Sequence, residues 1–544
     1  MRYGSRQSSQ LSSASQGRGT GEGEATDPRD IWSALPTARP DPASRVSAAY
    51  NADASSSKID LSLPGFREDS GKPFLPPTVR HAEKQLRNAE LFNRDALPVW
   101  GDERFLAEGI KFAYGSDHAK LKLENIAAIQ ASTLTGALRL AGTFLSRFSG
   151  PSSRSIYLPS PTTEEDTSTL RDAGLDIRHY RYLDRKTGAV DFDGLQADLQ
   201  AAPARSVVML YVSGSVPTGV DLSDAQWRMI TTILQERSLI PLVVLAFQGL
   251  ATGDAVKDAQ PLRLMAQEGL PVVLCQSFDA MMGLYSDSPS ILSVVSQSPE
   301  TKSRVDSQLR AVARGMHVHP SPWGAHIAHV ILSDAKLHPA WLNEIKAMSG
   351  RLRSVRDKLY DLLANKFKTP GNWIHIKRSV GLYCTTLLSP IINDILGTKR
   401  HIYLLPHGSF SLGSLNSLKI EQLARSIDSA VLASIHEAEQ VQAQQLAMEL
   451  ALAAAKEAAA REEAEALAAD QAREEDRMLM ENSIASAIEA QRRAEEEERD
   501  REEEERRRME EDLELDQAVR KAAERAQIAR QAEAILASIG AGMG

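Results

Sequence analysis

The feature that most constrains the fold is a run from about residue 436 to residue 538 that contains no proline and no glycine. Alanine, glutamate, glutamine and arginine dominate this run, which is the composition of one long helix or a coiled coil. At a rise of 1.5 Å per residue, ~100 helical residues would extend roughly 150 Å. We therefore expect a long charged helix or coiled coil over residues 436–539 and a frayed, glycine-rich end over residues 540–544.

The rest of the chain divides into two unlike parts. Residues 1–28 are rich in Ser, Gly, Gln and Arg, so we expect a disordered tail. Residues 29–435 alternate apolar, β-rich runs with longer amphipathic stretches, which predicts an α/β fold with a mainly parallel sheet. The expected strands are Ser206–Val212, Leu239–Leu245, Val272–Gln276 and His375–Lys377. The expected helices are Thr135–Phe148, Leu222–Glu236 and Pro339–Leu363.

Composition argues against several other classes of protein. The chain has 63 Lys and Arg against 72 Asp and Glu, a net charge of -9, which argues against a nucleic-acid binder. We expect no membrane-spanning helix, because no sufficiently long apolar run is present. Cys275 and Cys384 are too few for a disulfide scaffold or a Cys-only zinc site. The basic stretch Met1–Gly21 lacks the amphipathic face of a mitochondrial transit peptide, so we favour a cytoplasmic protein over a mitochondrial one.

Several strings in the middle segment occur in the order and spacing of one enzyme family. They are KIDLSLPGFREDSGKP (Lys58–Pro73), TLTGALRLAGTFL (Thr133–Leu145), SGSVPTGVD (Ser213–Asp221), PLVVLAFQGLATG (Pro241–Gly253), SFDAMMGLY (Ser277–Tyr285) and ARGMHVHPSPWGAHI (Ala313–Ile327). These strings resemble class I aminotransferases of the aspartate aminotransferase type; SFDAMMGLY, for example, is similar to the family's SYSKNFGLY. The resemblance implies a fold-type I enzyme over residues 29–435, with a large domain, a smaller α/β domain and pyridoxal phosphate as cofactor. It also implies a homodimer, in which an arm resembling Asp41–Tyr50 crosses to the partner subunit.

The resemblance places the family's catalytic lysine at Ala280. A methyl group forms no imine and moves no proton, so we expect no catalytic residue. Val244 stands where the family has a carboxylate that faces the pyridine nitrogen of the cofactor. Phe247 and Val216 stand where a tyrosine and an asparagine contact the ring oxygen. Lys257 lies in a polar stretch, and we do not expect it to replace the missing lysine.

The resemblance also implies a weakened phosphate site. Ser288 replaces an arginine that would bind the phosphate in a bidentate manner. Leu134 replaces a glycine whose backbone approaches the phosphate. Thr135 and Ser277 are retained at phosphate-contact positions, although Thr135 could equally cap a helix. We therefore expect no cofactor, in contrast to the family.

The positions that match substrate-binding residues are half retained. Ser409 replaces the arginine that binds the α-carboxylate of the substrate. Arg314 matches the arginine that reaches from the neighbouring subunit to a side-chain carboxylate, and it is equally explained by a surface or interface ion pair.

Four histidines and a cysteine offer other chemistry. The spacing of His317 and His319, and of His326 and His329, is found in zinc sites. Because the equivalent family segment lies at a subunit interface, we expect no metal. Cys275 ends an apolar run, which favours a core thiol over a nucleophile.

Two stretches of the charged helix resemble ubiquitin-interacting motifs. The first keeps Leu479 and Ser486, and the second keeps Leu515 and Ala518. The apolar stripe of such a helix packs on an apolar patch of its partner while its acids face basic residues. Acid-rich alanine helices match this pattern by chance, so a spacer or a helix for another protein partner is the alternative.

The sequence favours an aspartate aminotransferase-like protein that has lost transamination. We expect a dimeric scaffold or interaction protein that binds protein partners, with ubiquitin as one candidate, through residues 436–539. Neither nucleic acid nor membrane is an expected partner. The alternative is an active pyridoxal-phosphate-dependent aminotransferase that acts on amino acids such as aspartate.

Overall fold

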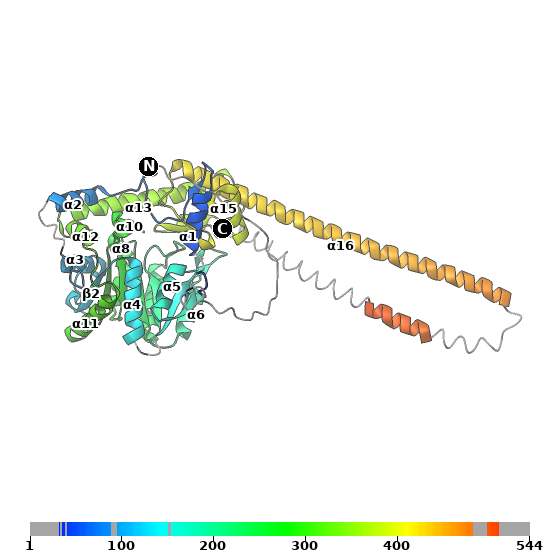
Figure 1. Ribbon diagram of the computed structural model, residues 1–544, viewed down its shortest axis with the longest axis horizontal. Coiled ribbons are helices and arrows are strands. Elements are labelled where there is room, and N and C mark those ends of the chain that lie inside the picture. The colour runs from blue at the N-terminus through cyan, green and yellow to red at the C-terminus, as the bar shows by residue number, and fades with distance from the viewer. Residues whose placement is uncertain are drawn as a thin grey trace. The chain divides into compact units, whose positions relative to one another are not determined.

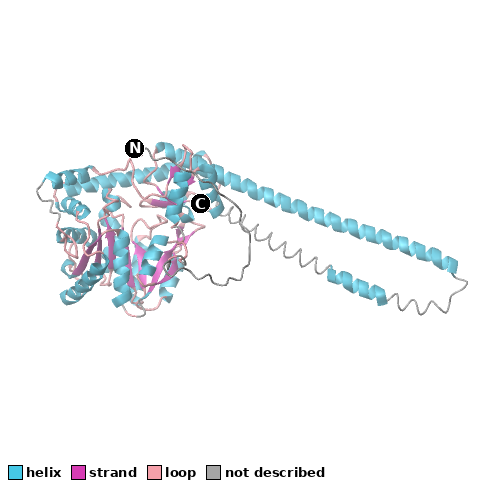
Figure 2. Ribbon diagram, viewed as in Figure 1, coloured by secondary structure: helices cyan, strands magenta, loops and turns pink. Residues whose placement is uncertain are grey.

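A computed structural model describes residue 32 and residues 35–38, 41–88, 95–148, 150, 154–481 and 498–510. Figure 1 labels the elements along the chain, and Figure 2 distinguishes helices from strands. The expected tail over residues 1–28 and the expected frayed end over residues 540–544 lie outside the described residues. None of the described helices is both long enough and apolar enough to cross a membrane.

A seven-stranded sheet forms the centre of the large domain, in the order β2-β10-β9-β8-β7-β3-β4. Only β10 runs antiparallel to its neighbours, so the prediction of a mainly parallel sheet is confirmed. The strands are β2 (Ile126–Ala131), β3 (Ser155–Ser160), β4 (Asp176–Arg181), β7 (Val207–Tyr211), β8 (Ile240–Leu245), β9 (Val273–Ser277) and β10 (Ser290–Val295). Every residue of β7, β9 and β10 is buried, because helices cover both faces of the sheet.

The two faces of the sheet are packed by different helices. Alternate residues of one strand serve opposite faces, so Val208 and Leu210 join one core while Val207 and Met209 join the other. The first face packs on α3 (Glu103–Tyr114), α6 (Phe192–Ala201), α7 (Asp224–Glu236) and α9 (Gln260–Gln267). The second face packs on α4 (Leu134–Phe148), α5 (Glu164–Asp172) and α11 (Pro299–Met316).

A smaller set of elements surrounds a third core. Part of the large domain also contributes side chains to this core. Two short sheets pair β1 (Ile59–Asp60) with β12 (Ile402–Tyr403), and β11 (Tyr383–Thr385) with β13 (Ser409–Ser411). The helices around this core are α2 (Pro77–Asn88), α10 (Asp279–Met282), α12 (Trp323–Ser333), α13 (Leu337–Asp361), α14 (Ile374–Arg378) and α15 (Pro390–Arg400). Further elements are α1 (Pro42–Ala52), α8 (Ala255–Asp258) and the β5–β6 hairpin (Leu183–Asp184 and Ala189–Val190).

The helices expected near residues 135, 222 and 339 are confirmed as α4, α7 and α13, and a capping box at Ser223 and Gln226 starts α7. The strand expected at His375–Lys377 is wrong, because these residues lie in α14. The ring nitrogens of His375 lie 3.2 Å from the carbonyl oxygen of Asn372 and 2.9 Å from that of Thr385. Three residues of apolar alternation fit a single helical turn as well as a strand, so the sequence did not separate the two.

The long helix α16 spans Ser417–Glu481 and begins before residue 436, where we expected it. Its first turns belong to the folded domain, since Leu423 and Ile427 are buried in the third core. The hydroxyl of Thr369, in the loop that follows α13, donates to Asp428 at 2.7 Å and holds this part of the helix to that loop. From residue 446 to residue 473 every residue is exposed. One continuous helix therefore passes from the domain into an arm without a break at the expected boundary.

Candidate functional site

The positions matched to cofactor-binding residues gather at one edge of the central sheet. Val244 is the next-to-last residue of β8, Ser277 is the last residue of β9, and Ala280 follows in α10. Leu134 begins α4, directly after β2. The carboxyl ends of parallel strands are where α/β proteins of this kind bind ligands. The structure therefore places these residues where a ligand site is expected.

Most of the side chains at these matched positions are apolar. Val244, Phe247 and Ala280 are all buried, with Val244 fully so. Leu134 and Val216 are half-buried and pack against the same two cores as these residues. Aliphatic groups can pack against a flat ring, but they offer no hydrogen bond to a ring nitrogen or oxygen.

Asp279 is the most consequential residue that the sequence reasoning missed. It precedes Ala280, and its half-buried carboxylate accepts hydrogen bonds from the Ser288 hydroxyl at 3.1 Å and from the backbone N–H of Ala280 at 2.7 Å. Its own backbone N–H donates to Ser277 Oγ at 3.3 Å. Burial raises the pKa of Asp279. A signal was present in the sequence, because SFDAMMGLY has Asp where the family string SYSKNFGLY has Ser.

Two further carboxylates come from the first turn of α5. Glu165 accepts a hydrogen bond from the hydroxyl of Thr135, so one retained phosphate-contact side chain is bonded to an acid. Asp166 accepts hydrogen bonds from Tyr211 and Thr163, each at 2.7 Å, and burial raises its pKa to about 6. Sequence reasoning missed both acids, since nothing in the local pattern indicates that α5 meets the start of α4.

Tyr383 lies near all three acids. It is buried, and its pKa is raised first by burial and then by the charges of its neighbours, which include Glu165, Asp166 and Asp279. The ring of Tyr383 meets the ring of Phe247 edge to face, with 6.4 Å between the ring centres. The site therefore combines an apolar, aromatic lining with several carboxylates.

The two serines that the resemblance matches to family arginines are neutral, and both donate hydrogen bonds. Ser288 donates to Asp279, as described above, and Ser409 donates to the carbonyl oxygen of Pro217 at 2.6 Å. Ser409 lies in β13 and is fully buried. Arg314 is exposed in the last turn of α11. A single chain does not test its match to an arginine that a neighbouring subunit would supply.

Thr135 does not cap α4. The hydroxyl oxygen of Thr133 accepts from the backbone N–H of Gly136 at 2.8 Å, and α4 begins at Leu134. The capping role therefore belongs to Thr133, two residues earlier than the alternative for Thr135. The hydroxyl of Thr135 is left for Glu165.

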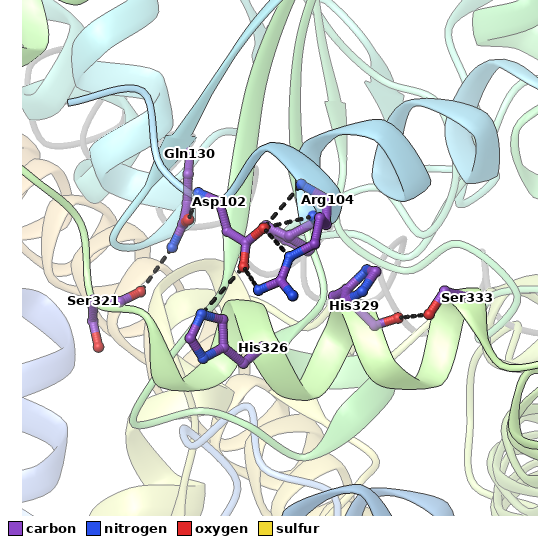
Figure 3. A network of polar contacts seen from close by, with 8 residues as sticks. Asp102, Arg104, Gln130, Ser321, His326, His329 and Ser333 are labelled. Atoms are coloured by element: carbon purple, nitrogen blue, oxygen red, sulfur yellow. Dashed lines mark hydrogen bonds and ion pairs between the residues drawn. The ribbon is translucent and has the colours of Figure 1, made fainter. Parts of the chain in front are cut away.

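The histidine-rich segment holds a hydrogen-bonded network. Figure 3 shows Asp102 between Arg104 and His326, with Gln130 reaching towards Ser321. Nε2 of His326 lies 3.1 Å from Asp102 Oδ2, and Nη2 of Arg104 lies 2.9 Å from the same oxygen. Burial alone would raise the pKa of Asp102, but the hydrogen bonds from His326 and Arg104 hold it well below its ordinary value. Among the described residues, no group of three His, Cys, Asp or Glu could hold a metal ion.

Replacing Asp102 by Asn should lower the free energy of unfolding by about 1 kcal/mol at pH 7, because Asn still caps α3 but lacks the charge. A carboxyl group with a lowered folded pKa adds stability above its ordinary value of 3.8, and this contribution is lost as the pH falls through the folded value. Urea denaturation should therefore show a smaller difference between the two proteins at pH 3 than at pH 7. An equal difference at both pH values would contradict this assignment.

The comparisons with known proteins identify the family. The family model "Aminotransferase class I and II" matches residues 56–427. The chain belongs to this family. Aspartate aminotransferase 1 of Medicago sativa is 37% identical over 401 residues, which cover 74% of this chain and 95% of that protein. The mitochondrial aspartate aminotransferase of Schizosaccharomyces pombe is 34% identical over 398 residues, covering 73% of this chain and 90% of that protein.

Solved structures of aminotransferases have the same fold as this family member. The cytoplasmic aspartate aminotransferase of Saccharomyces cerevisiae superposes with a TM-score of 0.71 at 30% identity, covering 74% of this chain and 98% of that one. An aromatic-amino-acid aminotransferase of Burkholderia pseudomallei, covalently bound to pyridoxal phosphate, gives 0.70 at 29% identity, covering 74% and 99%. The fold-type I prediction is confirmed, and the family depends on pyridoxal phosphate. Some relatives are named as cytoplasmic and others as mitochondrial, so the comparisons do not decide where this protein is located.

A second family model, "PV-1 protein (PLVAP)", matches residues 341–540. The match begins inside α13 of the aminotransferase domain and runs through the arm, so it spans two structurally unlike parts of the chain. Of the residues that resemble a ubiquitin-interacting motif, Leu479 lies within α16, while Ser486, Leu515 and Ala518 lie outside the described residues.

Proposed function

We propose that this aminotransferase-family chain no longer transaminates and acts as a homodimeric scaffold or interaction protein. The observation that carries the proposal is the pair Asp279–Ala280, which puts a half-buried carboxylate and a buried methyl group where the family binds its cofactor. Lysine chemistry needs an amine at this point, and the chain offers none at that position.

The residues of the site do not fit pyridoxal phosphate. A phosphate dianion needs nearby cations or free donors, whereas Ser288 donates to Asp279 and Thr135 donates to Glu165. Two negative groups brought together in a partly buried site repel each other strongly. The pyridine nitrogen would face the fully buried side chain of Val244, which cannot keep it protonated. We therefore derive no reaction step through this cofactor.

The proposed partners follow from the remaining parts of the chain. The homodimer rests on the family resemblance and on the arm-like segment, part of which forms α1. Residues 436–539 would bind protein partners, and ubiquitin is a candidate through Leu479, Ser486, Leu515 and Ala518. A net charge of -9 disfavours nucleic acid. We propose a cytoplasmic location, with a mitochondrial one as the alternative.

The competing proposal is an active aminotransferase that acts on amino acids such as aspartate. In its favour are the complete fold and the aspartate aminotransferases among the relatives. It requires an imine-forming amine at a position other than 280, and it requires the cofactor to be held beside Asp279.

Addition of pyridoxal phosphate to the purified protein separates the two proposals. We expect no imine absorbance band beyond that of free cofactor, and no label after borohydride reduction and peptide mapping. The cytoplasmic aspartate aminotransferase of Saccharomyces cerevisiae serves as the positive control. A stoichiometric, reducible adduct at one lysine would contradict the loss of transamination and support the competing proposal.

A further inference from the structure

A cavity of about 970 Å³ lies between α1, the β5–β6 hairpin and the segments on either side of α15. Val46 and Ala49 of α1 line it, together with Leu388, Leu404 and the hairpin residue Arg185. None of the positions matched to cofactor-binding residues lines this cavity. Small-molecule sites are typically pockets of roughly 300–1,000 Å³ with mainly apolar walls and a few polar groups. The cavity therefore has the size and the lining of a second ligand site.

The wall formed by α1 is fixed by contacts with the folded domain. The ring of Tyr50 meets the ring of Tyr403 edge to face, with 5.6 Å between the ring centres. Asp53 directly follows α1, and its carboxylate accepts a hydrogen bond from the hydroxyl of Tyr403 at 2.8 Å. The same carboxylate oxygen lies 2.7 Å from Nδ1 of His401. These contacts hold α1 against β12, so the wall is in place before a ligand binds.

Gly397 keeps part of the cavity open. It lines the cavity from within α15, although a glycine inside a helix is destabilising relative to alanine. A Cβ atom added at this position would meet only the carbonyl oxygen of Ile402 within 4 Å, at a distance of 3.9 Å. Packing therefore does not require glycine here, and its effect is to widen the cavity.

The charged side chains that line the cavity are mostly cationic. They are Arg45, Arg185 and Lys186, with one carboxylate, Asp394. No ion pair of the described residues involves Arg45 or Arg185, whereas Lys186 has Asp184 nearby. Arg185 donates one hydrogen bond to a backbone carbonyl oxygen at 3.1 Å. Because a guanidinium has five N–H donors, Arg185 retains others for a ligand.

We propose that this cavity binds a free organic anion, a carboxylate or sulfonate joined to an aliphatic or aromatic body. The body packs against the apolar walls at Val46, Leu388 and Leu404, and the acidic group pairs with Arg45 and Arg185. Hydrogen bonds between a guanidinium and an anionic group are shorter and stronger than those between neutral groups. This site lies apart from the matched cofactor positions and does not depend on the loss of transamination.

Fluorescence titration of the full-length chain with anilinonaphthalene sulfonate, a small aromatic anion, tests the charge preference. Phenylnaphthylamine is the matched neutral dye, because it has the same rings without the sulfonate. We expect the anionic dye to bind about tenfold more tightly than the neutral one, because only it pairs with the arginines. The variant Arg45→Gln/Arg185→Gln should lose this preference. The control Arg154→Gln/Arg228→Gln removes the same charge at two exposed positions outside the cavity and should keep it.

A second pair of variants locates the bound dye. Gly397→Trp places an indole ring in the cavity and should weaken the binding of both dyes about tenfold, because it occupies their space. Gly350→Trp is the control, since Gly350 also lies in a helix, α13, and an added Cβ atom there meets no atom within 4 Å. Gly350 does not line the cavity, so this variant should bind as the parent does. Circular dichroism checks that both variants fold.

Three results would overturn the inference. Equal affinities of the parent for the two dyes would make the cavity an apolar site without a preference for anions. Unchanged binding by Gly397→Trp would place the dye at another part of the chain. No binding at millimolar concentrations of the anionic dye would mean that the cavity takes no such ligand. None of these results bears on transamination, which the borohydride experiment tests separately.

Discussion

Replacing Ala280 by lysine should leave the protein without measurable transamination of aspartate. The new amine would stand beside the half-buried carboxylate of Asp279, in a site where Val244 cannot support a protonated pyridine ring. Ser288 and Ser409 would still hold neither a phosphate nor a substrate carboxylate. A positioned acid–base residue contributes typically 10²–10⁴-fold, so one restored group cannot replace the several that are missing. A coupled enzyme assay that follows transfer of the amino group from aspartate to a keto acid measures the rate of transamination.

The matched comparison is a variant that also carries Val244→Asp, Ser288→Arg and Ser409→Arg. Turnover in this multiple variant alone would show that the fold still supports transamination once charged side chains are introduced at these positions. Turnover in the single variant Ala280→Lys would contradict the proposal that the whole site has been lost. Circular dichroism and thermal denaturation should confirm that each variant remains folded.

Much of the fold could be predicted from the sequence because its signals are local. The apolar runs of β7 and β8 indicate strands buried on both faces, and the long amphipathic stretches indicate covering helices. His375 shows the limit of such reasoning. Its segment is too short for periodicity to separate a strand from a helical turn, and contacts with Asn372 and Thr385 decide its conformation.

The candidate site could be located, but its electrostatics could not. The matched strings place Ala280, Val244 and Ser288 together, and the structure gathers them at one edge of the sheet. The acids Glu165 and Asp166 reach this region only because α5 packs against α4, a contact between segments 30 residues apart. Sequence periodicity carries no information on such a contact. Three-dimensional structure was therefore needed to see that carboxylates gather at this site.

Removing residues 417–544 should prevent the domain from folding, whereas removing residues 436–544 should change its stability by less than about 1 kcal/mol. The first truncation deletes Leu423, Ile427 and Val431, which are fully buried in the third core. Each large aliphatic side chain lost from a core costs about 2–5 kcal/mol, and a domain has only about 5–15 kcal/mol in total. Soluble yield and urea denaturation of the two truncated chains measure the difference.

Two point substitutions within α16 make the same argument without deleting any chain. Leu423→Ala should lower the free energy of unfolding of the domain by about 2–5 kcal/mol, because the side chain is fully buried. Leu452→Ala removes the same atoms from a side chain that is 50% exposed, so we expect a change within about 0.5 kcal/mol. Equal effects would mean that the arm, and not only the root of α16, stabilises the domain. The expected difference places the boundary of the stable domain inside a continuous helix, at the point where its buried residues end. No proline or glycine marks this point in the sequence.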